Sequence, residues 1–207
     1  MNRTELKNWA KEKIKGHIGE LFVALLIVGI LTNLTIGGHV SVDGSNVSYS
    51  SGIPLGLIFY FVEVGLVYYM IKFFNDEARQ LKDLFKYSSD FGRIFLTGLL
   101  ESLFTFLWAL LLVIPGIIKA IAYSLVPFIL ADEKYNNLGY MEILKKSEEM
   151  MMGHKMDYFV LGLSFIGWHI LAIFTLGLLE IWIMPYETTA KYKFLNDLKA
   201  EYENSSK

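Results

Sequence analysis

Residues 93–131 read RIFLTGLLESLFTFLWALLLVIPGIIKAIAYSLVPFILA, and this run contains only three charged residues, Arg93, Glu101 and Lys119. A membrane-spanning helix needs roughly 20 mostly apolar residues to cross a hydrocarbon core about 30 Å thick. The run is long enough for two such helices, which we place at residues 93–114 and 117–131. Pro115-Gly116 lies between them and favours a tight turn. The sequence therefore predicts a helical hairpin within a membrane.

The rest of the chain repeats this alternation of apolar runs and charged segments. Apolar residues make up 54% of the sequence and charged residues 19%, whereas ordinary globular proteins are roughly 45–50% apolar. The other apolar runs predict spans at residues 18–36, 53–74, 157–174 and 178–194. Thr175-Leu176-Gly177 predicts the turn between the last two. The predicted fold class is all-α, a polytopic membrane protein with six transmembrane helices in three hairpins. Residues 1–207 would form a single membrane domain with units at about 1–74, 75–131 and 132–207.

The basic residues fall on one side of this predicted arrangement. The three loops on the other side are Gly37–Gly52, Pro115-Gly116 and the turn at Gly177, and none contains Lys or Arg. Of the 19 Lys and Arg residues, only Lys119 is assigned to the interior of a span. Cytoplasmic flanks of membrane proteins are enriched in Lys and Arg. We therefore expect a multi-pass protein of the cytoplasmic (plasma) membrane with both termini in the cytoplasm.

Each predicted hairpin is preceded by a short amphipathic segment. One face of each segment is apolar: Leu6, Trp9, Ala10 and Ile14 in residues 4–15; Ala78, Leu81, Leu84 and Phe85 in residues 76–87; and Leu138, Met141, Leu144, Ser147 and Met151 in residues 137–152. Basic amphipathic helices beside spans commonly lie along the headgroup interface. The alternative is that they pack on one another as cytoplasmic caps. The common order of helix, span, turn and span predicts an internal repeat of three units in one orientation.

Composition and motifs argue against several classes of function. The formal net charge of −2 gives no basic surplus for nucleic-acid binding. The chain has no Cys, which rules out disulfides, thiolate metal sites and thiol catalysis. It has no His-Glu-x-x-His helix, Gly-x-Ser-x-Gly elbow or phosphate loop. We therefore predict a protein that is not an enzyme and that has no catalytic residue, cofactor or metal.

Five ionisable side chains within the predicted spans are candidate functional residues: Glu63, Glu101, Lys119, His169 and Glu180. Such a group costs about 2.5–3.5 kcal/mol at the centre of a membrane helix on insertion scales. At 1.5 Å per residue, Glu63 and Glu101 lie at nearly the same depth, near the midplane. They predict a proton or cation site built from two carboxyl groups. The alternative is that both are protonated, each hydrogen-bonded to a Tyr, Ser or Thr of a neighbouring helix.

The other three candidates lie in the outer half of the predicted membrane domain. Lys119 and Glu180 match in depth and predict an ion pair between the fourth and sixth spans. His169 is expected to be a neutral imidazole bonded to an indole or carbonyl beside Trp168, or to join that pair. Glu187 lies at a span boundary, where water is expected to solvate its carboxylate without a protein partner.

Residues 114–132 read IPGIIKAIAYSLVPFILAD, and residues 153–168 read GHKMDYFVLGLSFIGW. Both stretches resemble an uncharacterised family of bacterial six-helix integral membrane proteins, and the resemblance covers nearly the whole chain. The layout is also loosely similar to the membrane domain attached to some glycerophosphodiester phosphodiesterases. These residues show no soluble catalytic domain, so that activity is not carried over. The resemblance implies a helical membrane fold and a bacterial origin, and it assigns no reaction.

Function is predicted only in outline. Polar residues inside the spans favour a protein that binds or moves a small or lipidic solute within the lipid bilayer. The alternative is a non-catalytic membrane scaffold or envelope-assembly factor that acts through its amphipathic helices. An intramembrane enzyme would need a nucleophile–base or metal constellation, which the sequence does not show. A water-accessible cavity at Glu63 and Glu101 would favour the first function, and a dry, close-packed bundle the second.

Overall fold

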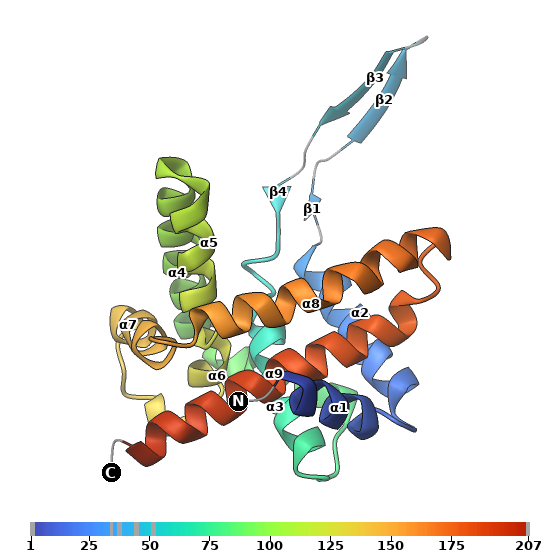
Figure 1. Cartoon of the computed structure of the whole chain (residues 1–207). Coiled ribbons are helices and arrows are strands. Elements are labelled where there is room, and N and C mark those ends of the chain that lie inside the picture. Colours follow the sequence, from blue (N-terminus) through green and yellow to red (C-terminus); the bar gives the residue numbers. More distant parts are fainter. Residues whose placement is uncertain (1–2, 34, 37–38, 44–45, 51–52, 206–207) are drawn as a thin grey trace.

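The architecture comes from a computed structural model, which describes residues 3–33, 35–36, 39–43, 46–50 and 53–205. Two helical hairpins and a pair of strands extend from a helical body (Figure 1). The helices are α1 (Arg3–Lys13), α2 (Ile18–Thr32), α3 (Tyr60–Phe74), α4 (Phe91–Leu111), α5 (Val113–Ala122), α6 (Val126–Leu130), α7 (Tyr140–Met150), α8 (Lys155–Phe174) and α9 (Glu180–Ser205). Two 3₁₀ helices are η1 (Leu81–Asp90) and η2 (Glu133–Tyr135).

Several helical segments are long and apolar enough to cross a membrane, which indicates a helical membrane protein. Among the described residues these are Leu81–Leu110, Val113–Leu130 and Lys155–Phe174. A fourth results if α1 and α2, which meet at a bend of 103°, are taken as one broken span. Helix α3 has 15 residues, about 22 Å at 1.5 Å per residue, which is less than the hydrocarbon thickness. The helical class is confirmed, while the number of six spans stays a prediction.

The first predicted hairpin differs from the structure at its outer end. Helix α2 ends at Thr32 rather than at residue 36, and α3 begins at Tyr60 rather than at residue 53. Between them are two antiparallel strand pairs: β1 (Thr35–Ile36) with β4 (Ile53–Pro54), and β2 (His39–Asp43) with β3 (Asn46–Ser50). The valines and tyrosine that alternate with polar residues here favour extended backbone. The rest of the predicted loop at Gly37–Gly52 lies outside the described residues.

The second hairpin turns earlier than predicted. Leu112, with φ −159° and ψ 137°, separates α4 from α5, so Pro115-Gly116 lies in the first turn of α5 instead of between the helices. Proline is tolerated there because an N–H in the first helical turn has no intrahelical partner. A Cβ on Gly116 would lie 2.7 Å from the Cα of Ala109. This glycine therefore lets the two helices of the hairpin pack closely.

The fourth predicted span is broken into two helices. Helix α5 ends at Ala122, and α6 begins at Val126, whose N–H donates to the carbonyl three residues earlier at 2.9 Å. Pro127 has no N–H to donate, which weakens a continuous helix at this point. The Ala122 carbonyl accepts a hydrogen bond from the buried Ser147 hydroxyl at 2.7 Å. Helix α7 thus satisfies a backbone group that the break leaves without a helical partner.

Helices α8 and α9 are joined at the turn that was predicted between the fifth and sixth segments. Gly177 has φ +84°, a left-handed conformation that glycine adopts at little cost, and its N–H donates to the Ala172 carbonyl at 2.9 Å. Helix α9 does not end at residue 194 but continues to Ser205. In Figure 1, α8 and α9 (orange and red) run across the direction of the green α4–α5 hairpin.

The second amphipathic segment buries only one residue of its predicted face, Leu84. It becomes helical only at Leu81, where η1 begins, and it buries Leu84 and Tyr87. The predicted face residues Ala78, Leu81 and Phe85 are exposed. A 3₁₀ helix has three residues per turn, which places positions i and i+3 on one face. The segment is therefore 3₁₀-helical from Leu81 up to a kink at Tyr87, where φ is −94° and ψ is 16°, and the α-helical period used for the prediction held only at Leu84.

The first and third amphipathic segments follow their predictions more closely. Helix α1 buries Leu6 and Ala10 as expected. In the α7 segment the predicted Leu144 is buried, whereas Met141 is 56% exposed and Ile143 is buried in its place. Helix α1 packs against α9, and α7 packs against α4 and α6. Both helices are therefore fixed to the body, and their position at the headgroup interface stays a prediction.

Candidate functional site

A polar cavity lies where α3, α4, α8 and α9 meet the break between α5 and α6. Its volume is about 190 Å³. The residues that line it are Tyr60, Glu63, Glu101, Tyr123, Ser124, Pro127, Phe128, Tyr158, Tyr192 and Leu195. We call this cavity the chamber. Two carboxyl groups and four phenol rings thus share one small space in the part of the chain that the sequence assigns to the membrane.

The chamber brings together the two carboxyl groups that were predicted to share one depth, Glu63 and Glu101. Tyr60 precedes Glu63 by three residues on α3, so the two side chains lie on one helix face. The Tyr60 hydroxyl donates to Glu101 Oε2 at 2.7 Å. A Cβ on Gly98 would lie 2.7 Å from Tyr60 Cδ1. Gly98 therefore gives the tyrosine ring the room on α4 that this hydrogen bond needs.

The two carboxyl groups differ in their partners. Glu101 has the tyrosine partner that was expected for a carboxyl group inside the membrane domain. Within the described part of the chain, no side chain or backbone N–H donates a hydrogen bond to the Glu63 carboxyl. A polar group in an apolar environment is costly without a partner. Glu63 is therefore the group of the chamber that is open to water, a proton or a ligand.

The α5–α6 break supplies part of the chamber wall, through Tyr123, Ser124 and Pro127. Irregular backbone at membrane depth is tolerated where it is buried in protein or lines a cavity. Solute sites of many membrane transporters lie at such interrupted helices. The sequence analysis read residues 117–131 as one helix and so missed this feature, although Pro127 was a signal for it.

Aromatic contacts hold two of the tyrosine rings in place. Tyr192 packs edge-on against Phe128, with ring centroids 5.3 Å apart. The rings of Tyr158 and Phe194 lie 5.7 Å apart and are tilted. These contacts position the Tyr192 and Tyr158 rings in the chamber wall.

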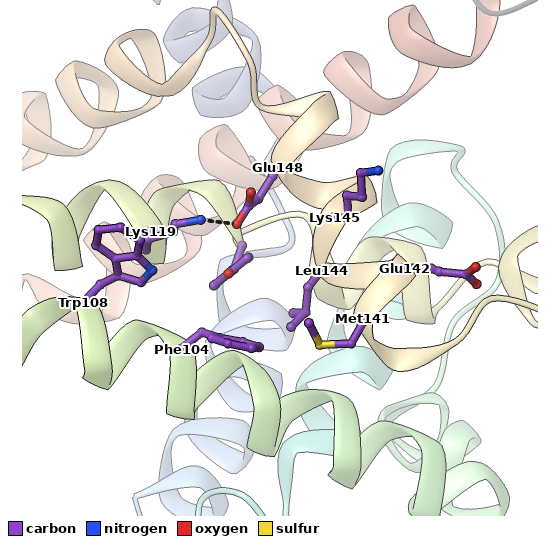
Figure 2. A pocket seen from close by; sticks show the side chains of 9 residues that line it. Phe104, Trp108, Lys119, Met141, Glu142, Leu144, Lys145 and Glu148 are labelled. Atoms are coloured by element: carbon purple, nitrogen blue, oxygen red, sulfur yellow. Dashed lines mark hydrogen bonds and ion pairs between the residues drawn. The ribbon is translucent and has the colours of Figure 1, made fainter.

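Lys119 does not pair with Glu180, so that prediction was wrong. Its Nζ lies 2.5 Å from Glu148 Oε1 on α7, and Trp108 lies beside it, with its ring centroid 5.5 Å from Nζ (Figure 2). Helix α7 packs against α4 and α6, and this packing places Glu148 next to α5. Glu148 was missed because the sequence analysis assigned it to a cytoplasmic segment, whereas the α4–α5 hairpin meets α7 at the level of Lys119.

The environment of Glu148 favours its charged form. Burial opposes ionisation, but hydrogen bonds from Lys119 and Tyr123 outweigh it and hold the pKa of the Glu148 carboxyl below its usual value. The pair borders a second pocket of about 420 Å³, whose apolar wall includes Phe104. Glu142 also lines this pocket and points away from the pair (Figure 2). Tyr123 is a wall residue of both this pocket and the chamber.

A double-mutant cycle tests the observed partner of Lys119. We expect Lys119→Met and Glu148→Gln together to cost less thermal stability than the sum of the two single changes. The coupling should be about 0.2–1 kcal/mol, because a partly exposed pair gains little. The measurement is thermal unfolding in detergent. Lys119→Met combined with Glu180→Gln is the matched control and should be additive; coupling in this control alone would contradict the observed pairing.

His169 lies between two carboxyl groups on α9. Its Nδ1 is 2.9 Å from Glu180 Oε1, and its Nε2 is 2.6 Å from Glu187 Oε2. Glu187 also pairs with Lys191 at 2.5 Å. The expected indole or carbonyl partner of His169 was therefore wrong, and the alternative holds in part, since His169 contacts Glu180 but not Lys119. The assignment of Glu187 to simple hydration was also wrong. The signal was present in the sequence, since Glu180 and Glu187 are seven residues apart and share one helix face.

A surface groove of about 540 Å³ between α5 and α8 adjoins the chamber. His169, Glu187 and Lys191 lie along it. Ser124 and Tyr158 line both the groove and the chamber. Polar groups therefore lie along the groove from the α8–α9 pair to the two residues that it shares with the chamber wall.

The family model described as "Protein of unknown function (DUF975)" matches residues 1–122 and 110–202 of the chain. No curated protein and no solved structure matches the sequence or the fold. The matches together extend over nearly the whole chain, as the resemblance seen in the sequence implies.

Proposed function

The chain belongs to the DUF975 family of proteins of unknown function, and we propose that it is a non-enzymatic integral membrane protein that binds a small solute in the chamber and moves it across the bilayer. The observation that carries this proposal is the cavity at Glu63 and Glu101. A close-packed bundle without function would fill this space with apolar side chains, because buried polar groups without partners are costly.

In the proposed arrangement, six segments in three hairpins cross the cytoplasmic membrane of a bacterium, with both termini in the cytoplasm and three related units in one orientation. The one-sided distribution of Lys and Arg supports this orientation. The tips of two hairpins carry no charged residue and expose large apolar side chains, with Leu110 73% and Leu176 96% exposed. Exposed apolar surface of this kind is typical of contacts with lipid or with a partner protein.

Cysteine labelling tests whether water reaches the chamber. The chain has no Cys, so Ser124→Cys introduces a single thiol in the wall shared by the chamber and the groove. We expect charged methanethiosulfonate reagents to modify this thiol at least tenfold faster than Ser102→Cys, because the reactive thiolate forms only where water is present. Ser102 is the matched control. It follows Glu101 directly on α4 and is exposed on the outside of the helix, where the proposed arrangement places lipid rather than water. The measurement is mass spectrometry of protein labelled in open membrane fragments.

The same experiment decides between the two functions. Rapid labelling at Ser124→Cys alone supports a solute site. Equal and slow labelling at both positions would mean a dry chamber, and it would favour the alternative of a membrane scaffold or envelope-assembly factor. In that case the apolar hairpin tips and the packed helices α1 and α7, rather than the chamber, would be the parts to test.

A further inference from the structure

The composition of the chamber wall indicates the charge of its solute. We propose that the chamber binds a small organic cation, an amine or a quaternary ammonium compound, which replaces the proton on the Glu63 carboxyl. This inference rests on the proposed function, because it assumes that a solute enters the chamber.

Charge balance is the first argument. Glu63 and Glu101 both line the chamber, and no Lys, Arg or His of the described residues does. Two basic groups on the adjoining pockets already have carboxylate partners: Lys119 pairs with Glu148 and Lys191 with Glu187. An unpaired carboxylate inside a membrane is expensive. Each carboxyl group of the chamber therefore needs a proton or a cation that comes from outside.

The aromatic walls are the second argument. Four tyrosine rings line the chamber, and the face of an aromatic ring attracts a cation within about 6 Å of its centroid. The protein itself shows this preference at Tyr123, because Lys119 Nζ lies 5.6 Å from the centroid of that ring. Rings of this kind, combined with a carboxylate, form the usual binding site for substituted ammonium groups.

The remaining wall favours an organic cation over a metal ion. Hard cations such as Ca²⁺ take six to eight oxygen ligands at roughly 2.3–2.6 Å. The chamber offers instead two carboxyl groups and a few hydroxyls among the apolar surfaces of Pro127, Phe128 and Leu195. Its volume of about 190 Å³ is far larger than a bare ion and suits a molecule of several heavy atoms. An ammonium group with a short apolar chain matches both kinds of wall.

Glu63 is the carboxyl group that we assign to the cation. Glu101 already accepts the Tyr60 hydroxyl at 2.7 Å, whereas Glu63 accepts no hydrogen bond from the described residues. When the cation enters, the Glu63 O–H bond breaks, the carboxylate keeps the electron pair, and the proton passes to water in the adjoining groove. The cation and the proton therefore compete for one group, and cation binding should weaken as the pH falls.

A pair of isosteric probes tests the charge preference directly. Choline and 3,3-dimethyl-1-butanol have nearly the same shape, but only choline is charged. With the full chain in lipid nanodiscs at pH 8, we expect calorimetry to give a Kd for choline at least tenfold below that of the alcohol. Glu63→Gln should weaken choline binding at least tenfold and leave binding of the alcohol unchanged. Glu201→Gln, an exposed position outside the chamber, is the matched control and should change neither.

The outcomes separate this inference from the proposed function. Equal affinity for the two probes, or no measurable binding of choline, overturns the cation assignment. A second measurement does not depend on the folding of the Glu63 variant. It compares two methanethiosulfonate reagents of similar size at Ser124→Cys, one carrying a trimethylammonium group and one a sulfonate group. After correction for their rates with a free thiol, the trimethylammonium reagent should react at least fivefold faster. A faster reaction with the sulfonate reagent would overturn the assignment of a cationic solute but would still support a solute site. Failure of both reagents to react would overturn the proposed function itself.

Discussion

Gly65→Ala is expected to lower the free energy of unfolding by about 3 kcal/mol or more, because overpacking against backbone is not relieved by a side-chain rotation. A Cβ on Gly65 would lie 1.9 Å from the carbonyl oxygen of Leu84 and 2.5 Å from its carbon. Elsewhere in a helix the same change gains up to about 1 kcal/mol of helix propensity, so the clash acts against an intrinsic preference. Helix α3 and η1 would have to separate, and Glu63 lies two residues before this contact.

The matched control for Gly65→Ala is Gly167→Ala. Gly167 lies in the middle of helix α8, on its exposed side. A Cβ added there would have no other atom within 4 Å. We expect this variant to be neutral or slightly more stable than the parent chain. Both variants are measured by equilibrium unfolding in mixed detergent micelles and by the fraction recovered as monodisperse protein. Similar stability of the two variants would mean that η1 does not pack on α3 as described.

Local sequence signals were sufficient to predict the helices of the third hairpin. A long apolar run identifies α8, and a glycine at the required left-handed position identifies the turn at Gly177. Depth along a helix follows directly from the rise per residue, so the meeting of Glu63 and Glu101 at one level could also be predicted. These features depend on residues close in sequence or on a count along one helix.

The other chamber residues could not be predicted because their meeting depends on tertiary packing. Tyr60, Tyr123, Tyr158 and Tyr192 come from separate parts of the chain, and no sequence period relates them. The error at Lys119 has the same origin. Its depth was inferred from an unbroken helix with a turn at Pro115-Gly116, whereas the actual turn at Leu112 and the packing of α7 give it Glu148 as a partner.

The prolines that could break a helix were visible in the sequence, but the sequence did not show which of them does so. Pro115 falls in the first turn of α5, where it leaves the helix intact, while Pro127 accompanies a real break. Pro185 lies inside α9 without ending it. A proline therefore marks a position where a helical hydrogen bond is missing. Whether the helix starts, breaks or continues at that position depends on the tertiary contacts around it.

His169→Leu is expected to cost about 1–2 kcal/mol of stability, because it removes the group that bridges two carboxyl groups of the α8–α9 pair, and the partial exposure of its ring keeps the loss below that of a buried ion pair. The ring of His169 contacts Glu180 at 2.9 Å and Glu187 at 2.6 Å. Glu187 keeps Lys191 at 2.5 Å when the imidazole is removed, whereas Glu180 loses its partner. The loss should therefore come mainly from Glu180. Thermal unfolding in lipid nanodiscs is the measurement, and His154→Leu, at the start of the same helix, should change stability by no more than about 0.5 kcal/mol.

Combining His169→Leu with Glu180→Gln distinguishes a broken charge cluster from a simple packing defect. If the cost of His169→Leu comes from a carboxylate left without a partner, then neutralising that carboxylate should recover at least about 0.5 kcal/mol of the loss, since coupled sites depart from additivity by at least this amount. Strictly additive losses would show that His169 acts only through its volume. Recovery would show instead that His169, Glu180 and Glu187 are stable on the α8–α9 pair as a set, because each carboxyl group contacts the imidazole between them.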